Sequence, residues 1–226
     1  MAKRRKKRKL EEETLVDIVE VKESAQSFIE QNQIAIIAGA SILVLLVGGF
    51  LSYTFLYQAP RETEAKEQIF RAEYQYMRDS FALALENPGG GYEGLLDIID
   101  NYSGTKTANL AMYYAGTAYL NLGRFEDAIS YLESHNPKSL TKITTYGALG
   151  DAYSELGDMD SAIDNYQKAA NSDNEALTPY YLNKLGLLYN RQGDKDKALA
   201  SFERIKEDFP ESPLAVTIDK YIGMLK

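Results

Sequence analysis

One pattern of glycine, alanine and aromatic residues occurs three times in the C-terminal half of the chain. In each copy a glycine is followed by a tyrosine three residues later, a second glycine seven later and an alanine twelve later. The leading glycines are Gly116, Gly150 and Gly186, so the copies are 34 and 36 residues apart. A period of this length is typical of stacked helix pairs that bury their apolar faces against their neighbours. The pattern therefore predicts an all-α solenoid.

Each repeated residue type has a physical explanation. The leading glycines fall inside predicted helices, where glycine costs ~1 kcal/mol relative to alanine, so we expect a partner helix to approach closely there. The alanines have the same role on the second helix, and the second glycines suit a turn that requires positive φ. The alanines are Ala128, Ala162 and Ala198, and the turn glycines are Gly123, Gly157 and Gly193.

With its aromatic and proline positions, such as Tyr166, Phe202 and Pro210, the pattern resembles the tetratricopeptide repeat (TPR). That family has a helix-turn-helix unit of about 34 residues. An ordinary helical bundle would also place small and aromatic residues in its core. Three copies at a nearly constant period favour the repeat, and the resemblance implies three clear repeats within 107–226.

The segments on either side of the three repeats are also predicted to be helical. Apolar residues from Glu62 to Leu85 recur at helical intervals, and a short apolar helix is expected over 95–99. We interpret 60–106 as a degenerate leading repeat, since terminal repeats usually cap a solenoid. At the other end, Ser212 and Pro213 open a final helix that is expected to cap the last repeat.

The segment 34–57 contains 24 residues without a charge and is rich in Ile, Leu, Val and Ala. A helix of this length reaches about 36 Å, which exceeds the ~30 Å hydrocarbon core of a bilayer. Tyr53, Phe55 and Tyr57 suit the aromatic belt at the membrane interface, and Pro60 is expected to break the helix. A cleavable signal peptide has a shorter apolar region that ends in small residues, so an uncleaved transmembrane signal anchor is the preferred interpretation.

The orientation of this anchor follows from the basic residues beside it. Residues 3–9 are seven consecutive cations, and the segment 1–33 is expected to be a cytoplasmic, partly helical region. The positive-inside rule then places the repeats on the extracytoplasmic side. The cationic run could also contact anionic lipid or nucleic acid. For a tethered protein, topology and lipid attraction are the preferred explanations.

The composition restricts the function further. Residues 60–226 carry 17 basic and 26 acidic side chains, and this acidic balance argues against nucleic-acid binding. The chain has no cysteine, so it has no disulfide or thiol nucleophile. Its one histidine, His135, is expected on the surface without catalytic partners. The sequence predicts no enzymatic activity, no cofactor and no metal site.

The TPR resemblance implies a concave surface, lined by the first helix of each repeat, that binds peptides or helices of other proteins. Asp151 and Glu155 on this surface would repel the carboxylate that one TPR subclass clamps, so extended or partly apolar segments are the expected ligands. The family's groove positions correspond here to Leu110, Tyr113, Thr117, Leu120, Asn121, Thr144, Gly147, Asp151, Ser154, Glu155, Tyr180, Asn183, Leu187, Asn190 and Arg191.

The whole layout resembles the membrane-anchored TPR family that contains the ancillary subunit of the bacterial Sec translocon. That resemblance implies a single-pass protein of the bacterial inner membrane with a cytoplasmic N-terminus and periplasmic repeats. It implies partners among the translocon and periplasmic chaperones. Two alternatives remain at this point: a cytosol-facing TPR receptor, and an envelope assembly factor that self-associates through the end of the solenoid. An exposed apolar face on residues 215–226 would favour the second.

Overall fold

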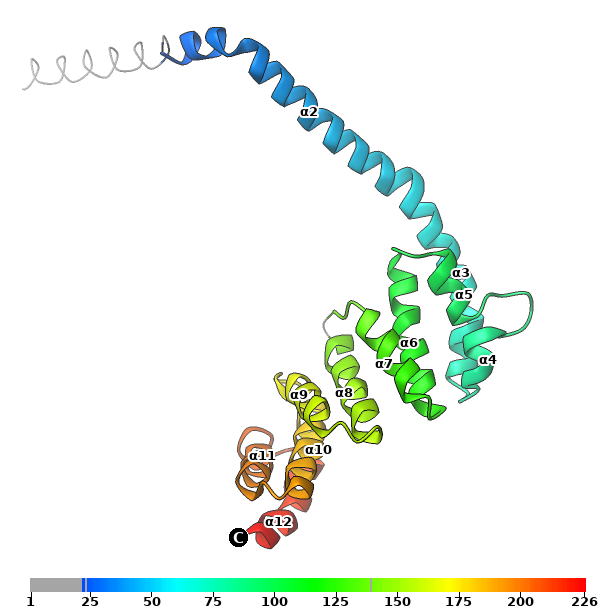
Figure 1. Ribbon diagram of the computed structural model, residues 1–226, viewed down its shortest axis with the longest axis vertical. Coiled ribbons are helices and arrows are strands. Elements are labelled where there is room, and N and C mark those ends of the chain that lie inside the picture. Colours follow the sequence, from blue (N-terminus) through cyan, green and yellow to red (C-terminus); the bar gives the residue numbers. More distant parts are fainter. Residues whose placement is uncertain (1–21, 23, 139) are drawn as a thin grey trace, which may run out of the picture. The chain divides into compact units, whose positions relative to one another are not determined.

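The computed structural model describes residue 22 and the ranges 24–138 and 140–226. The described residues form α-helices, one π-helical turn and no β-strand, which confirms the predicted all-α fold (Figure 1). The basic run 3–9 lies outside the described residues, as does most of the segment 1–33 that was expected to be partly helical. The helices are α2 Gln33–Ser52, α3 Ala59–Tyr76, α4 Phe81–Glu86, α5 Leu95–Asn101, α6 Lys106–Asn121, α7 Phe125–Ser134, α8 Leu140–Glu155, α9 Met159–Ala170, α10 Leu177–Gln192, α11 Lys195–Asp208 and α12 Pro213–Leu225.

Helix α2 contains most of the uncharged segment. None of its residues is buried, and its large apolar side chains are exposed. The helical stretch Gln33–Tyr76 is long and apolar enough to cross a membrane by length and composition. The chain divides into two compact units between Tyr57 and Gln58, and each unit is described here by itself.

The expected helix break at Pro60 does not occur. A π-helical turn, η1 (Tyr53–Gln58), follows α2 directly, and α3 begins at Ala59 with Pro60 in its first turn. Proline has no N–H and would remove a hydrogen bond from a regular α-helix. Pro60 lies at the start of α3, where proline is tolerated because the missing N–H would have no partner within that helix. The prediction of a break at Pro60 was therefore wrong.

Three successive helix pairs, α6/α7, α8/α9 and α10/α11, correspond to the three sequence repeats (Figure 1). At each leading glycine a Cβ atom would lie less than 3.0 Å from a side chain sixteen residues later. The three neighbours are Leu132, Tyr166 and Phe202 on the second helices. The predicted close approach of the helices at Gly116, Gly150 and Gly186 is confirmed.

The turns between the paired helices also follow the sequence pattern. Gly123, Gly157 and Gly193 have φ of 72°, 80° and 83°, in the left-handed region that glycine enters without steric cost. In two repeats the next residue is the N-cap of the second helix. Asp158 and Asp194 accept hydrogen bonds from the backbone N–H groups of Ser161 and Lys197. Hydrogen bonds from the side chains of these two residues, together with those from their backbone N–H groups, lower the pKa of both carboxyls.

The leading segment contains three helices rather than the expected two. The predicted helix over 62–85 is interrupted after Tyr76, and α4 begins at Phe81. Asp79 has φ of 56°, a conformation that non-glycine residues rarely adopt within a helix. Because of this break, α3 and α4 both pack against α6. The apolar faces of two helices, rather than of one long helix, thus cover the first repeat.

Glu62 of α3 caps the N-terminus of α6, more than forty residues later. Its carboxylate accepts hydrogen bonds from the backbone N–H of Lys106 (2.7 Å) and Thr107 (3.3 Å) and from the Thr107 hydroxyl (3.2 Å). Burial by itself would raise the pKa of Glu62, but these bonds and that from Lys66 together lower it. The carboxylate thus joins the leading helices to the first repeat.

We expect Glu62→Ala to lower the free energy of unfolding by about 2 kcal/mol, since hydrogen bonds to a charged group contribute about 1.5–3 kcal/mol. The lowered pKa means that this stabilisation is present above the unfolded value of 4.5 and is lost as the pH falls through the folded value. Thermal unfolding followed by circular dichroism at pH 7 and pH 3 tests both points. The exposed Glu67→Ala variant is the control, and an equal loss in both variants would contradict the cap.

Helix α12 closes the other end of the solenoid, as predicted. Its N-cap Ser212 accepts a hydrogen bond from the backbone N–H of Leu214, and Pro213 occupies the first turn. Ile218 is fully buried, and the Tyr221 ring lies 5.5 Å from the ring of Phe202 in the last repeat. The capping helix therefore shares its core with α10 and α11.

Candidate partner surface

The first helices of the three repeats, α6, α8 and α10, are packed in sequence order, α6 against α8 and α8 against α10. The residues predicted to line the partner groove differ in their accessibility on these helices. Asn121, Glu155, Tyr180, Leu187, Asn190 and Arg191 are exposed, and Tyr113, Leu120, Asp151, Ser154 and Asn183 are half-buried. Thr117 is buried.

Thr117 connects the leading segment to the first repeat. Its hydroxyl accepts a hydrogen bond from the Tyr76 hydroxyl (2.9 Å) and can donate to the backbone carbonyl of Tyr113 (2.9 Å). These partners use the hydrogen-bonding capacity of the side chain within the fold. Thr117 thus has an internal role at the junction between α3 and α6.

Gly147 is a close-packing position between adjacent repeats. A Cβ atom there would overlap the ring of Tyr181, which is almost completely buried. The absence of a side chain on α8 therefore makes room for an aromatic ring from α10. The space beside Gly147, which was predicted to be part of the partner groove, is filled by the Tyr181 ring.

Asp151 is the centre of a hydrogen-bonded cluster between the second and third repeats. Its Oδ1 atom accepts hydrogen bonds from the Tyr166 hydroxyl (2.6 Å) and from the Lys184 ammonium group (2.5 Å). Burial and the bond to Asp151 raise the pKa of Tyr166. The charge of Asp151 is balanced by Lys184. Of the two acids expected to repel a carboxylate, only Glu155 is exposed.

Tyrosine rings form two groups at the first helices, and one group includes Tyr76 of α3. Tyr114 lies 4.9 Å from Tyr76 and 5.8 Å from Tyr113 between ring centroids, and Tyr180 lies 5.1 Å from Tyr181. Tyr76, Tyr114, Tyr181 and Lys184 were absent from the predicted groove set. The adjacent tyrosine pairs at 113–114 and 180–181 are visible in the sequence and were the available signal.

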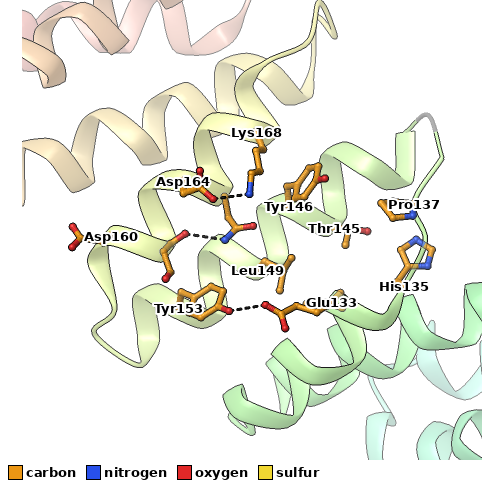
Figure 2. Close-up of a pocket in the computed structure, with 13 residues that line it drawn as sticks. Glu133, His135, Pro137, Thr145, Tyr146, Leu149, Tyr153, Asp160, Asp164 and Lys168 are labelled. Carbon is orange, nitrogen blue, oxygen red and sulfur yellow. Dashed lines mark hydrogen bonds and ion pairs between the residues drawn. The ribbon is translucent and has the colours of Figure 1, made fainter.

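A cavity of about 490 Å³ lies between the second helices of the first two repeats, over α8 (Figure 2). Figure 2 shows His135 and Pro137 toward one end of the cavity and Asp160 toward the other. Two lining residues, Glu133 and Tyr153, are joined by a hydrogen bond of 2.8 Å from the tyrosine hydroxyl. Together with burial, this bond raises the pKa of Tyr153 to about 12.

The expected surface position of His135 was wrong, because only 6% of the residue is exposed. Its Nδ1–H donates to the backbone carbonyl of Asn109 (2.8 Å), since a carbonyl can only accept. Burial lowers the pKa of the imidazole, against the raising effect of that hydrogen bond. The Nε2 atom is therefore an acceptor, and it is buried without a partner. The lone histidine follows the end of α7, at the repeat position that the buried Ala169 occupies in the next repeat.

Comparison with known proteins agrees with this architecture. Two tetratricopeptide repeat models match residues 148–213 and 110–134. A solved structure, the crystal structure of MamA protein, superposes with a TM-score of 0.53 at 20% sequence identity. The match covers 73% of this chain and 80% of that chain, and at this identity it shows the fold alone. No curated protein matches the sequence.

The paired helices, close-packing glycines and polar first-helix surface define a helical-repeat protein that binds other proteins or peptides. The chain contains tetratricopeptide repeats over residues 110–134 and 148–213. Its repeats indicate a scaffold for protein–protein interaction. Among the described residues, no group of three or more His, Cys, Asp or Glu side chains could hold a metal ion.

Proposed function

We propose that this protein is a membrane-anchored interaction scaffold whose repeats lie on the extracytoplasmic side of a bacterial inner membrane. The observation that carries the proposal is helix α2, which has no buried residue and no charge and precedes a TPR unit. The seven consecutive Lys and Arg residues at 3–9 support a cytoplasmic N-terminus. In this role the protein brings export or periplasmic chaperone components together at the translocon, and the role contains no catalytic step.

The proposed partner surface consists of the exposed residues on the first helices and the half-buried tyrosine beside them. Tyr113 and Tyr180 supply ring faces and hydroxyl tips, and Leu187 supplies apolar area. Tyrosine suits such a surface because it offers a large contact area at a low conformational-entropy cost. With Asp151 neutralised by Lys184, we expect extended segments that combine apolar side chains with backbone hydrogen bonds.

Protease protection in spheroplasts tests the topology. A C-terminal epitope tag should be degraded by protease added outside intact spheroplasts, and the chain should fractionate with membranes. A cytoplasmic marker that stays intact controls for lysis. Protection of the tag until lysis would overturn the extracytoplasmic assignment and favour the cytosol-facing receptor.

Crosslinking then tests the partner surface. A photoreactive residue at Asn190 on the exposed face of α10 should trap partners, and the same residue at Glu207 on α11 is the matched control, since both positions are exposed. Translocon or chaperone adducts at Asn190 alone would support the adaptor role. Equal adducts at both positions would contradict a role for the first-helix surface.

A second candidate function, an assembly factor that self-associates, is favoured by one observation on α12. Val216 is 79% exposed and Met224 is 68% exposed, and they lie on the same side of the helix eight residues apart. Apolar side chains left uncovered at the end of a solenoid are suited to contact a second copy. Sedimentation of the detergent-solubilised protein tests this function: a dimer that Val216→Asp converts to a monomer would support it, and a monomeric wild type would exclude it.

A further inference from the structure

The cavity between α7 and α9 carries an acidic charge that the partner-surface proposal does not use. Three of its lining residues are carboxylates, Glu133, Asp160 and Asp164, and one, Lys168, is a cation. The Lys168 ammonium group is 2.6 Å from Asp164, and Glu133 accepts the hydrogen bond from Tyr153. Asp160 forms no ion pair with the described residues. The cavity therefore carries a formal excess of two negative charges.

The next repeat contains an equivalent cavity with the opposite charge. It lies between α9 and α11 over α10, has a volume of about 370 Å³ and is lined by residues at corresponding repeat positions. Gln167 replaces Glu133, Ala200 replaces Asp164, and Lys197 replaces Ser161. The hydrogen bond of the wall tyrosine is kept, since Gln167 donates to the Tyr189 hydroxyl (2.7 Å). The solenoid thus produces a cleft at both positions without requiring carboxylates, so the acidic lining is specific to the first cavity.

His135 provides a second, independent indication of a ligand. The equivalent position in the next repeat is Ala169, which is fully buried, so the repeat does not require a histidine here. The unpartnered Nε2 acceptor belongs to a side chain that lines this cavity and a neighbouring one. A buried acceptor without a donor costs about 1–3 kcal/mol. A ligand N–H that entered this end of the cavity, with a small shift of the non-helical connection 135–138, would supply the missing bond.

Tyr146 shows how a cation is held in this cavity. The Lys168 ammonium nitrogen lies 5.6 Å from the centre of the Tyr146 ring, within the range of a cation–π interaction. The same ammonium group pairs with Asp164. Lys168 thus occupies an aromatic and acidic site that an external cation could share or take over.

We propose that the α7–α9 cavity binds a lysine or arginine side chain of a partner protein. Carboxylates, a tyrosine face and an imidazole acceptor together match a group that carries positive charge and N–H donors. A long side chain suits an open cleft on a protein-binding solenoid. This surface is formed by α7, α9 and one face of α8, and it contains none of the residues of the first-helix surface proposed above.

Fluorescence anisotropy of the full chain in detergent micelles tests the proposal. The probe is a fluorescein-labelled Gly-Ser-Lys-Gly-Arg-Ser-Gly peptide, and the same peptide with norleucine at both cationic positions is the control probe. The double variant Glu133→Gln with Asp164→Ala introduces the residue types that the equivalent cavity has at these positions. We expect it to weaken binding of the cationic peptide about tenfold. Equal binding of the norleucine peptide would overturn the proposal.

Two matched pairs of variants separate this site from general attraction to an acidic protein. Asp160→Asn should weaken binding about threefold to fivefold, and Asp196→Asn, at the same position of the next repeat, should leave it unchanged. His135→Asn retains a donor for the Asn109 carbonyl but removes the Nε2 acceptor, and should also weaken binding. Equal losses in the Asp160 and Asp196 variants would overturn the site.

Lys168→Gln provides a gain of function that misfolding cannot imitate. Removing the internal cation frees Asp164 and the ring of Tyr146, so the cationic peptide should bind about threefold more tightly. Unchanged or weaker binding would contradict the proposed competition. Spermidine serves as a competitor: binding of spermidine without binding of the peptide would identify a small-amine site and overturn the assignment to a partner side chain.

Discussion

Phe202→Ala is expected to lower the free energy of unfolding of the repeat unit by about 3–5 kcal/mol. Phe202 is fully buried and fills the space beside Gly186, and its ring centre lies 5.5 Å from that of Tyr221 on the capping helix. Its removal leaves a cavity where α10, α11 and α12 meet. A loss of this size should lower the melting temperature by about 10 °C, at 2–4 °C for each kcal/mol in a domain of 150–250 residues.

Thermal unfolding of the full chain in detergent, followed by circular dichroism at 222 nm, measures this effect. Phe70→Ala is the matched control, because Phe70 is 64% exposed on α3. A surface substitution of this kind should change the free energy of unfolding by less than about 0.5 kcal/mol. Equal losses in the two variants would show that Phe202 does not hold the last repeat to the capping helix.

The effect of Gly186→Ala on the free energy of unfolding is expected to depend on the residue at position 202. The substitution should destabilise the protein when Phe202 is present and stabilise it in the Phe202→Ala background. With Phe202 present, a Cβ atom at 186 would lie less than 3.0 Å from the ring, and overpacking costs about 1–3 kcal/mol. Alanine gains about 1 kcal/mol in helix propensity, so the loss is partly offset. In the Phe202→Ala background the clash disappears, and the same substitution should stabilise the protein by about 1 kcal/mol.

The full double-mutant cycle therefore has an expected coupling of about 2 kcal/mol between positions 186 and 202. Gly223→Ala on the exposed side of α12 is the control, since nothing lies within 4 Å of its Cβ position. That substitution should stabilise the wild-type protein by about 0.5–1 kcal/mol. Additive effects at 186 and 202 would contradict the view that the glycine is needed for close helix packing.

Much of the repeat architecture could be predicted because its causes are local or strictly periodic. The glycine turns depend on one residue's access to positive φ, and the aspartate caps depend on a side chain three residues from its donor. The approach of Gly150 to Tyr166 also follows from spacing, because the same two-helix unit occurs at each repeat. The uncharged run is visible in the same way, since its length and composition are properties of one continuous segment.

The features missed or misplaced by prediction depend on neighbours that are remote in the sequence or on local geometry that periodicity does not describe. The break after Tyr76 allows two helices to cover α6, and the burial of His135 results from the path of the α7–α8 connection. The proposed partner surface differs from its sequence-based version for the same reason. Lys184 neutralises Asp151 across 33 residues, and Tyr181 fills the position that Gly147 leaves open.

The sequence by itself thus determined that this chain is a set of stacked helix pairs with an apolar helix before them. Periodic small residues and single-residue backbone preferences are sufficient for that conclusion. The tertiary structure alone decided which charges are balanced, which tyrosines remain accessible, and that one of two equivalent clefts is acidic. Those properties arise where side chains from different repeats meet, and the free energy of each charge depends on partners that only the fold brings within hydrogen-bonding distance.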